Sequence, residues 1–131
     1  MYMLDTNICI YVLKKHSDAI RHKFNAIKDL CISSVTYGEL CFGIENSNSP
    51  NKKDLWDQLD FFTQRLLIET WDEDAARHYG SIRADLRSRG CLIGNNDLLI
   101  AAHARSIHAV LVTNNSKEFS RVQDLTIENW I

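Results

Sequence analysis

The sequence has little of what turns and membrane segments need. It contains one proline, Pro50, and five glycines among 131 residues, which argues against a loop-rich all-β domain. No uninterrupted apolar run approaches the roughly 20 residues of a membrane-spanning helix. An acidic residue, Asp5, stands where a signal peptide would have its apolar region. We therefore expect a cytoplasmic protein with no membrane partner.

An excess of positive charge is also missing. The chain has 15 basic and 17 acidic residues, a formal net charge of −2. This balance excludes a strongly basic protein that holds nucleic acid by bulk attraction. It remains compatible with a nucleic-acid enzyme whose metal site is acidic and whose rim is basic.

Several common motifs of catalysis and metal binding are absent. The four cysteines form no C-x-x-C pair and most have apolar neighbours, so we expect reduced, packed thiols and no zinc site. No G-x-x-x-x-G-K or G-x-G-x-x-G motif indicates a nucleotide cofactor. His103 lies within an apolar helical segment and is more simply a hydrogen-bonded core histidine than a catalytic one.

Short apolar segments alternate along the chain with helical ones. This alternation predicts an α/β fold with a parallel sheet covered on both faces. No repeat or linker interrupts it, so we expect a single domain over residues 1–131. The predicted strands are 1–5, 30–33, 66–68, 109–112 and 125–127. The predicted helices are 6–14, 17–27, 36–46, 51–66, 73–89, 96–107 and 116–121.

Four acidic residues stand near the starts of predicted helices. Asp5, Glu39 and Glu118 each follow a predicted strand, and Asp97 opens the helix that begins after Gly94. The loops after the carboxyl ends of parallel strands share one edge of the sheet, so these side chains are expected to meet. Clustered carboxylates repel one another, and a hard cation such as Mg²⁺ relieves that repulsion. Such a site suits attack by water on a phosphoryl group.

Each of these acids also has a purely structural alternative. Thr36-x-x-Glu39 matches a capping box, and Asn115-x-x-Glu118 is the analogous arrangement. Asp97 would also favour the positive end of a helix dipole. Asp5 is harder to explain structurally, because it ends a strand at the start of the chain in a place expected to be buried.

The four acids lie within motifs that resemble a known family. The motifs are Met3-Leu4-Asp5-Thr6-Asn7, Thr36-x-x-Glu39-Leu40-x-x-Gly43, Gly94-x-x-Asp97-x-x-Ile100-Ala101-x-His103-Ala104 and Thr113-Asn114-Asn115-x-x-Glu118-Phe119. Together and in this order they closely resemble the PIN domain and, more narrowly, VapC toxins of bacterial type II toxin–antitoxin pairs. The resemblance spans almost the whole chain, from Met3 to Glu128-Asn129-Trp130.

The resemblance implies a Mg²⁺- or Mn²⁺-dependent endoribonuclease with a three-layer α/β/α PIN-like fold and a short, mostly parallel sheet. Asp5, Glu39 and Asp97 match the family's acidic triad, with Asp5 and Asp97 as principal metal ligands and Glu39 completing the site directly or through water. Glu118 matches the fourth acidic position. Many relatives carry an aspartate near Asn115, so both residues stay open for that place.

The resemblance also suggests supporting residues and a substrate. Thr6, Asn7 and Asn115 would be polar supports for the carboxylates. Relatives cleave structured RNA, several of them tRNA in the anticodon stem-loop and some the initiator tRNA, which inhibits translation. Three arginines are candidates for holding RNA phosphates, with a solvated helix face as the alternative: Arg83, Arg87 and Arg89.

The implied partners are a second copy of the chain and a VapB-like antitoxin, with a higher toxin–antitoxin assembly left open. A basic antitoxin side chain entering the carboxylate cluster would displace the metal or pair with the acids. Trp56 is the aromatic residue favoured for an interface. Two other functions are considered. A haloacid-type phosphohydrolase needs D-x-D, but Asn7 occupies the second position, and a non-catalytic RNA- or protein-binding module would not need the acids.

Overall fold

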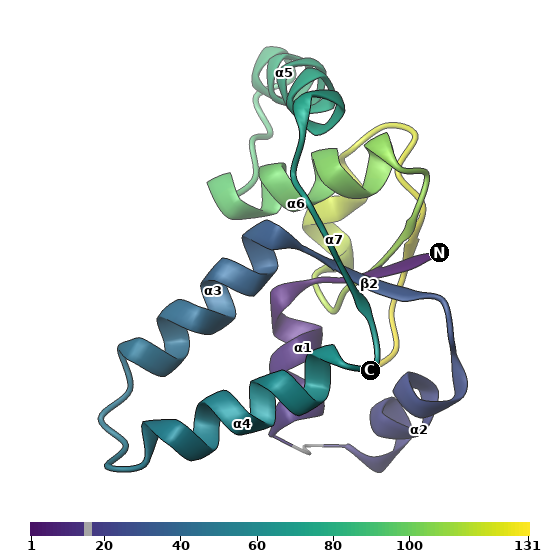
Figure 1. The fold of residues 1–131 in the computed structure, drawn as a ribbon. Coiled ribbons are helices and arrows are strands. Elements are labelled where there is room, and N and C mark those ends of the chain that lie inside the picture. Colours follow the sequence, from purple (N-terminus) through teal and green to yellow (C-terminus); the bar gives the residue numbers. More distant parts are fainter. Residues whose placement is uncertain (15–16) are drawn as a thin grey trace.

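Five parallel strands form the centre of the computed structural model, which describes residues 1–14 and 17–131 (Figure 1). The strands are β1 (Tyr2–Leu4), β2 (Leu30–Ser33), β3 (Leu67–Glu69), β4 (Val110–Val112) and β5 (Ile127–Glu128). Their order is β3-β2-β1-β4-β5, and each neighbouring pair is parallel. The predicted α/β class is confirmed, and the sheet is parallel throughout.

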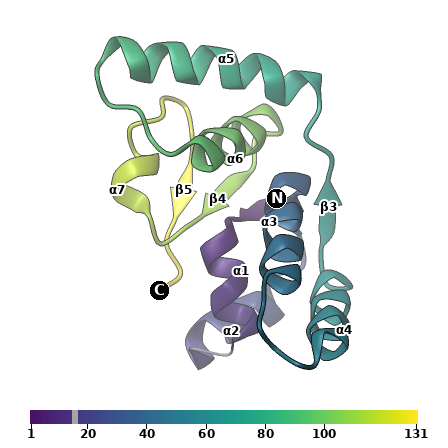
Figure 2. The same cartoon turned by 90° about the vertical axis from the view of Figure 1, so that its left-hand side faces the viewer.

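Helices connect the strands and cover both faces of the sheet. They are α1 (Thr6–Leu13), α2 (Asp18–Ala26), α3 (Ser34–Glu45), α4 (Lys52–Thr63), α5 (Glu73–Ser88), α6 (Asn95–Ser106) and α7 (Ser116–Phe119). In Figure 2, α5 lies outside α6, farthest from the sheet. Gly90 follows the end of α5 with φ of 65°, the left-handed conformation expected of a glycine after a helix.

Alternation along the short strands builds the three layers. In β1, Met3 packs into the core shared with α5 and α6, whereas Leu4 packs into the core shared with α1 and α4. In β4, Leu111 and Val112 divide between the same two cores. Successive side chains of a strand point to opposite faces, so a strand of three residues contributes to both cores. The sheet is therefore buried on both sides.

The strand order reverses at β1. The chain proceeds from β1 to β2 and β3 on one side, then returns to place β4 on the other side of β1. In open parallel sheets ligands bind at the carboxyl ends of the strands where the order reverses. Here that point lies between β1 and β4, directly after Leu4 and Val112.

Several predicted boundaries differ from the structure. Helix α3 begins at Ser34 rather than residue 36, because the hydroxyl of Ser33 caps it by accepting the Val35 amide at 3.1 Å. The last strand is Ile127–Glu128 rather than 125–127, a register fixed by pairing with β4. All four cysteines, which lie within the described ranges, are free thiols. In residues 1–14 and 17–131, no helix combines the length and apolarity needed to cross a membrane.

Candidate active site

Asp5 joins β1 to α1 and is almost fully buried, with 3% of its surface exposed. Its carboxylate oxygen Oδ1 accepts the backbone N–H of Ile8 at 2.9 Å, so Asp5 is the N-cap of α1. Burial raises the pKa of this carboxyl group, with a smaller contribution from the charge of Glu39. Hydrogen bonds from the Thr113 side chain and from the Ile8 and Asn7 backbone oppose that rise in pKa.

Glu39 lies in the second turn of α3, and both of its carboxylate oxygens accept hydrogen bonds. Thr6 Oγ1 donates to Oε1 at 2.7 Å, and Asn96 Nδ2 donates to Oε2 at 3.0 Å. The capping-box alternative is wrong for this residue, because Ser33 rather than Thr36 caps the helix. The side chain of Glu39 is thus directed toward α1 and α6 rather than toward its own helix terminus.

Asp97 lies in the first turn of α6, close to the other predicted acids. Burial is the largest cause of its raised pKa, which reaches about 6. The negative charges of Asp5, Glu118 and Glu39 raise the pKa of Asp97 further, while a hydrogen bond from the Asn115 side chain opposes them. Asp97 also keeps its favourable position at the positive end of a helix dipole.

The fourth predicted position contains both of its candidates. Glu118 is half-buried in α7, and its charge acts on Asp97. Asn115 precedes the same helix but makes no side-chain cap bond, and its backbone amide donates to Thr113 Oγ1 at 2.9 Å. The reciprocal capping box is therefore not formed among the described residues. Asn115 and Glu118 thus both act on Asp97, the first by a hydrogen bond and the second by its charge.

The structure thus brings the four predicted acids to the carboxyl edge of the sheet. Their donor chemistry fits a hard cation, because all are carboxylates and, in addition to burial, the charges of the other three raise the pKa of Asp97. In the part of the chain that is described, no three His, Cys, Asp or Glu side chains gather closely enough to hold one ion together. The arrangement fits Mg²⁺, which is commonly bound by one or two carboxylates while waters and substrate phosphates complete its shell.

The three predicted polar supports differ in how they act. Thr6 uses its hydroxyl to hold Glu39, and Asn115 uses its side chain to hold Asp97. Asn7 is exposed and supports Asp5 through its backbone amide. A backbone contact does not depend on the identity of the side chain, so the sequence alone gives no reason for an asparagine there.

His103 lies in the core below this edge, as predicted. It is 1% exposed, and its Nδ1 lies 2.7 Å from Ser33 Oγ. Burial lowers the pKa of His103, although the charges of Asp72 and Glu69 oppose that change. The neutral imidazole ties α6 to the end of β2, the strand that leads into the helix carrying Glu39.

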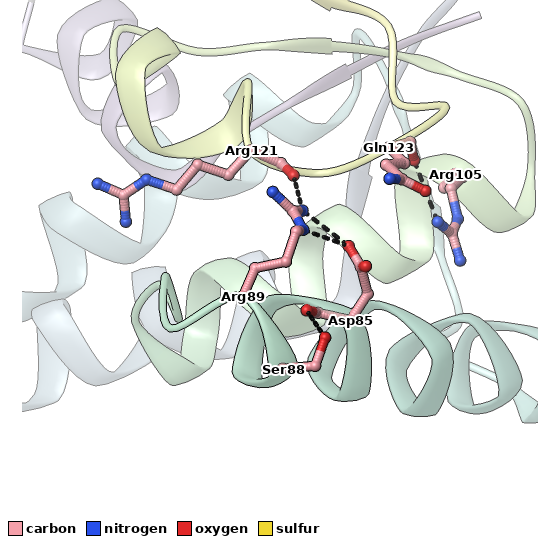
Figure 3. A network of polar contacts seen from close by, with 6 residues as sticks. All are labelled: Asp85, Ser88, Arg89, Arg105, Arg121 and Gln123. Carbon is pink, nitrogen blue, oxygen red and sulfur yellow. Dashed lines mark hydrogen bonds and ion pairs between the residues drawn. The ribbon is translucent and has the colours of Figure 1, made fainter.

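The predicted RNA-binding arginines lie on α5 and at its C-terminal end, in different environments. Arg83 donates to the Tyr79 hydroxyl at 2.7 Å, and that hydroxyl lies 3.4 Å from Asn95 Oδ1 at the start of α6. Arg87 is exposed. Arg89 contacts Asp85 Oδ2 and the carbonyl oxygen of Arg121, each at 2.7 Å (Figure 3). Arg83 therefore lies nearer the acidic site, whereas Arg89 joins α5 to the segment after α7.

Three polar residues of this site were not predicted as members of it. Thr113 supports Asp5, Asn96 holds Glu39, and Tyr79 orients Arg83. Asn96 adjoins Asp97 in the sequence, and Thr113 belongs to the motif that contains Asn115 and Glu118, which was the available signal. Tyr79 stands four positions before Arg83, the spacing of neighbours on one helix, but its contact with Asn95 depends on the packing of α5 against α6.

The sequence is similar to known proteins over almost its whole length. The family model described as PIN domain matches residues 2–125. The chain is 43% identical to Ribonuclease VapC2 of Rickettsia felis, over 99% of this chain and 98% of that protein. It is 42% identical to the tRNA(fMet)-specific endonuclease VapC of Shigella flexneri, over 98% and 97% of the two chains.

A solved structure is similar over the same length. It is the crystal structure of VapBC2 from Rickettsia felis bound to a DNA fragment from their promoter. The two chains share 41% identity with a TM-score of 0.93, and the match covers 99% of this chain and 98% of the other. Sequence and backbone similarity therefore extend over the whole edge that carries the acids.

Proposed function

The chain belongs to the PIN domain family, and from this premise we propose that it is an endoribonuclease toxin of the VapC type, with residues 1–131 forming a single domain. Its nuclease activity follows from near full-length similarity to proteins named as ribonucleases and as a tRNA(fMet)-specific endonuclease. Its substrate is RNA, specifically tRNA with the initiator tRNA as the leading candidate.

One observation carries the chemical part of this proposal. Burial and, in addition, the charges of carboxylates from three other segments raise the pKa of Asp97 to about 6. Such repulsion weakens a folded protein unless a ligand compensates it. A divalent cation is the simplest compensating ligand for a set of oxygen donors. We therefore take the function, rather than stability, as the reason for this arrangement.

Asp5 and Asp97 would hold Mg²⁺ or Mn²⁺ through their carboxylate oxygens. When bound, such an ion activates a water and stabilises the leaving oxygen in hydrolysis of a phosphodiester bond. Glu39 would complete the site directly or through water, and Glu118 would act through water or toward the scissile phosphate. Thr6 orients Glu39, and Asn115 orients Asp97. Asn7 donates its backbone N–H to Asp5.

The RNA backbone would approach along α5. Arg83 is held by Tyr79 beside the first turn of α6, which supports a phosphate contact close to the acids. Arg87 lies one turn further along the helix and extends the same positive surface. Arg89 belongs to the predicted surface too, although a phosphate there would compete with Asp85 and the Arg121 carbonyl.

A small antitoxin and a second copy of this chain are the proposed partners. The similar VapBC2 structure supports the antitoxin as a partner, and the second copy is proposed from the family resemblance. An apolar groove between α1, α3 and α4 has Glu39 in its lining and leads toward the acids. Phe42 and Phe61 are 67% and 72% exposed, whereas Trp56 is partly buried and donates to Glu45 within the chain. The two phenylalanines are therefore stronger interface candidates than Trp56.

The test is cleavage of purified tRNA, followed by sequencing of the new RNA ends. Wild-type protein is expected to cut with Mg²⁺ or Mn²⁺ and to stop in EDTA. The Asp97→Asn variant is expected to stay folded and inactive. Full cleavage by that variant in EDTA would refute the proposed site. Undiminished RNA binding without any cleavage in Mn²⁺ would favour a non-catalytic binding module.

A further inference from the structure

Glu39 is held from two sides by residues of two other helices. Oε1 accepts the Thr6 hydroxyl of α1 at 2.7 Å, and Oε2 accepts the Asn96 amide of α6 at 3.0 Å. An ionised carboxylate only accepts hydrogen bonds, so the amide nitrogen of Asn96 must be the atom that faces it. Asn96 is 57 positions from Glu39 in the sequence. Only the folded chain brings this donor to that acceptor.

The Thr6 side of this arrangement has further support. Thr6 Oγ1 also lies 3.3 Å from Thr36 Oγ1. One hydroxyl has one proton, and the shorter contact to Glu39 takes it, so Thr36 is the donor to Thr6. Thr36, the first donor in this series of hydrogen bonds, is fully buried and therefore held in place by the core. Asn96, in contrast, is exposed, so its hydrogen bond to Glu39 lies on the solvent side of the site.

From this geometry we infer that Asn96 is a positioning residue for Glu39, an inference that rests on the proposed nuclease function. A glutamate side chain has three freely rotating bonds, so a single hydrogen bond leaves its second oxygen able to move. Donors at both oxygens, from different helices, fix the carboxylate toward Asp5 and Asp97. Partners of this kind commonly contribute 10- to 100-fold to metal affinity or activity.

The adjacent residue shows that this role is specific to one position. Asn95 accepts a hydrogen bond from Tyr79 of α5, whereas Asn96 donates to Glu39 of α3. Two neighbouring asparagines of the same turn therefore face different elements. The first borders the proposed RNA surface, and the second borders the acids.

The experiment measures Mn²⁺ affinity by calorimetry and tRNA cleavage by kcat and KM for the wild type and Asn96→Ala. Asn96→Ala is expected to weaken Mn²⁺ binding and lower kcat by roughly 10-fold or more, with KM for tRNA and the melting temperature nearly unchanged. Asn48→Ala removes an exposed asparagine in the loop after α3 and serves as the matched control. Thr6→Val should behave like Asn96→Ala, while Thr6→Ser keeps the hydroxyl and should restore both values.

A double-mutant cycle with Glu39→Ala decides the route of the effect. If Asn96 acts through Glu39, Asn96→Ala changes the Mn²⁺ affinity little once Glu39 is gone. An equal loss of affinity in both backgrounds, or none in the wild-type background, overturns the inference. Failure of the proposed function would give a different result, because the wild-type protein would then neither bind Mn²⁺ nor cleave tRNA. That result would overturn the inference as well.

Discussion

His103 Nδ1 lies 2.7 Å from Ser33 Oγ, inside the core and beneath the acidic edge. The same serine oxygen accepts the Val35 amide at 3.1 Å, so its proton remains available for the unprotonated imidazole nitrogen. This single contact joins α6, which carries Asp97, to the start of α3, which carries Glu39. The relative position of two proposed site residues thus depends on a neutral histidine.

His103 should contribute a loss of stability in mild acid, opposite in sign to the contribution of Asp97, whose pKa is raised in the fold. Above about pH 6.5, His103 is neutral in both the folded and unfolded states. Below that pH the unfolded chain binds a proton that the folded chain refuses, because burial lowers the pKa of His103. The contribution of His103 to the free energy of unfolding should therefore fall as pH drops from about 6.5 through the lowered pKa. Urea unfolding of the wild type and of His103→Leu at several pH values measures it. The variant should be less stable overall, and the difference in free energy of unfolding between the two proteins should shrink as pH falls.

Asp97→Asn should stabilise the metal-free protein while abolishing cleavage. The raised pKa of about 6 means that the ionised carboxylate is disfavoured in the fold at neutral pH. Removing that charge should raise the free energy of unfolding by about 1 kcal/mol in EDTA, after allowance for solvent screening. The advantage over the wild type should shrink as pH falls from about 6 toward 4, where the wild-type carboxyl becomes protonated. Calorimetry in EDTA checks this, and a less stable variant would contradict it.

Two substitutions of Asp5 should separate its structural role from its chemical one. Asp5→Ala removes the N-cap of α1 as well as the proposed metal ligand. Its helix should lose about 1 kcal/mol of stability, whereas Asp5→Asn keeps an oxygen for the Ile8 amide. Both variants should lose cleavage by more than about 100-fold. Urea midpoints beside cleavage rates test this, and equal stability of the two variants would contradict the capping role.

Mn²⁺ should stabilise the wild-type chain in the absence of RNA. A ligand that binds only the folded state adds about 1.4 kcal/mol for each tenfold rise above its dissociation constant. The melting temperature should therefore climb with Mn²⁺ concentration. The double variant Asp5→Asn, Asp97→Asn should show no such rise, which separates site binding from a general salt effect. A rise of equal size in both proteins would place the ion elsewhere.

Substitution of Arg83 and substitution of Arg89 should have different effects. Arg83→Ala should weaken tRNA binding and reduce the slope of log affinity against log salt by about one. Arg89→Ala should chiefly lower the melting temperature, because it removes the contacts to Asp85 and the Arg121 carbonyl. Binding titrations at several salt concentrations and thermal melts test the two variants together. The reverse pattern would move the RNA surface toward the end of the helix.

The predicted elements were mostly right because their signals were local. Apolar alternation and the glycine after α5 are read within a few residues, and β2 was predicted with its observed bounds. The shift of β5 has a different cause, since its register depends on pairing of Leu111 with Ile127. The start of α3 was missed because two hydroxyl residues, Ser33 and Thr36, both suit a cap. In the folded chain Ser33 caps the helix, and the Thr36 hydroxyl contacts Thr6 instead.

The candidate site was only partly predictable, because some of its contacts join residues that are far apart in the sequence. Asp5, Glu39 and Asp97 follow the topology of a parallel sheet, so their convergence follows from the fold class. The hydrogen bonds that position these side chains do not follow from it. Asn96 donates to Glu39 of another helix, and no spacing along the chain relates the two. The contact of Tyr79 with Asn95 depends on the packing of α5 against α6, whereas its contact with Arg83 has the i, i+4 spacing of a single helix.

The position of β1 has a consequence for synthesis on the ribosome. It is made before β2 and β3, yet its second neighbour, β4, is made after both of them. A nascent polypeptide must wait with one side of its central strand unpaired until Val112 has emerged. Translation products that stop before β4 therefore lack the completed sheet, and a cell would meet the toxic form only after β4 has been made.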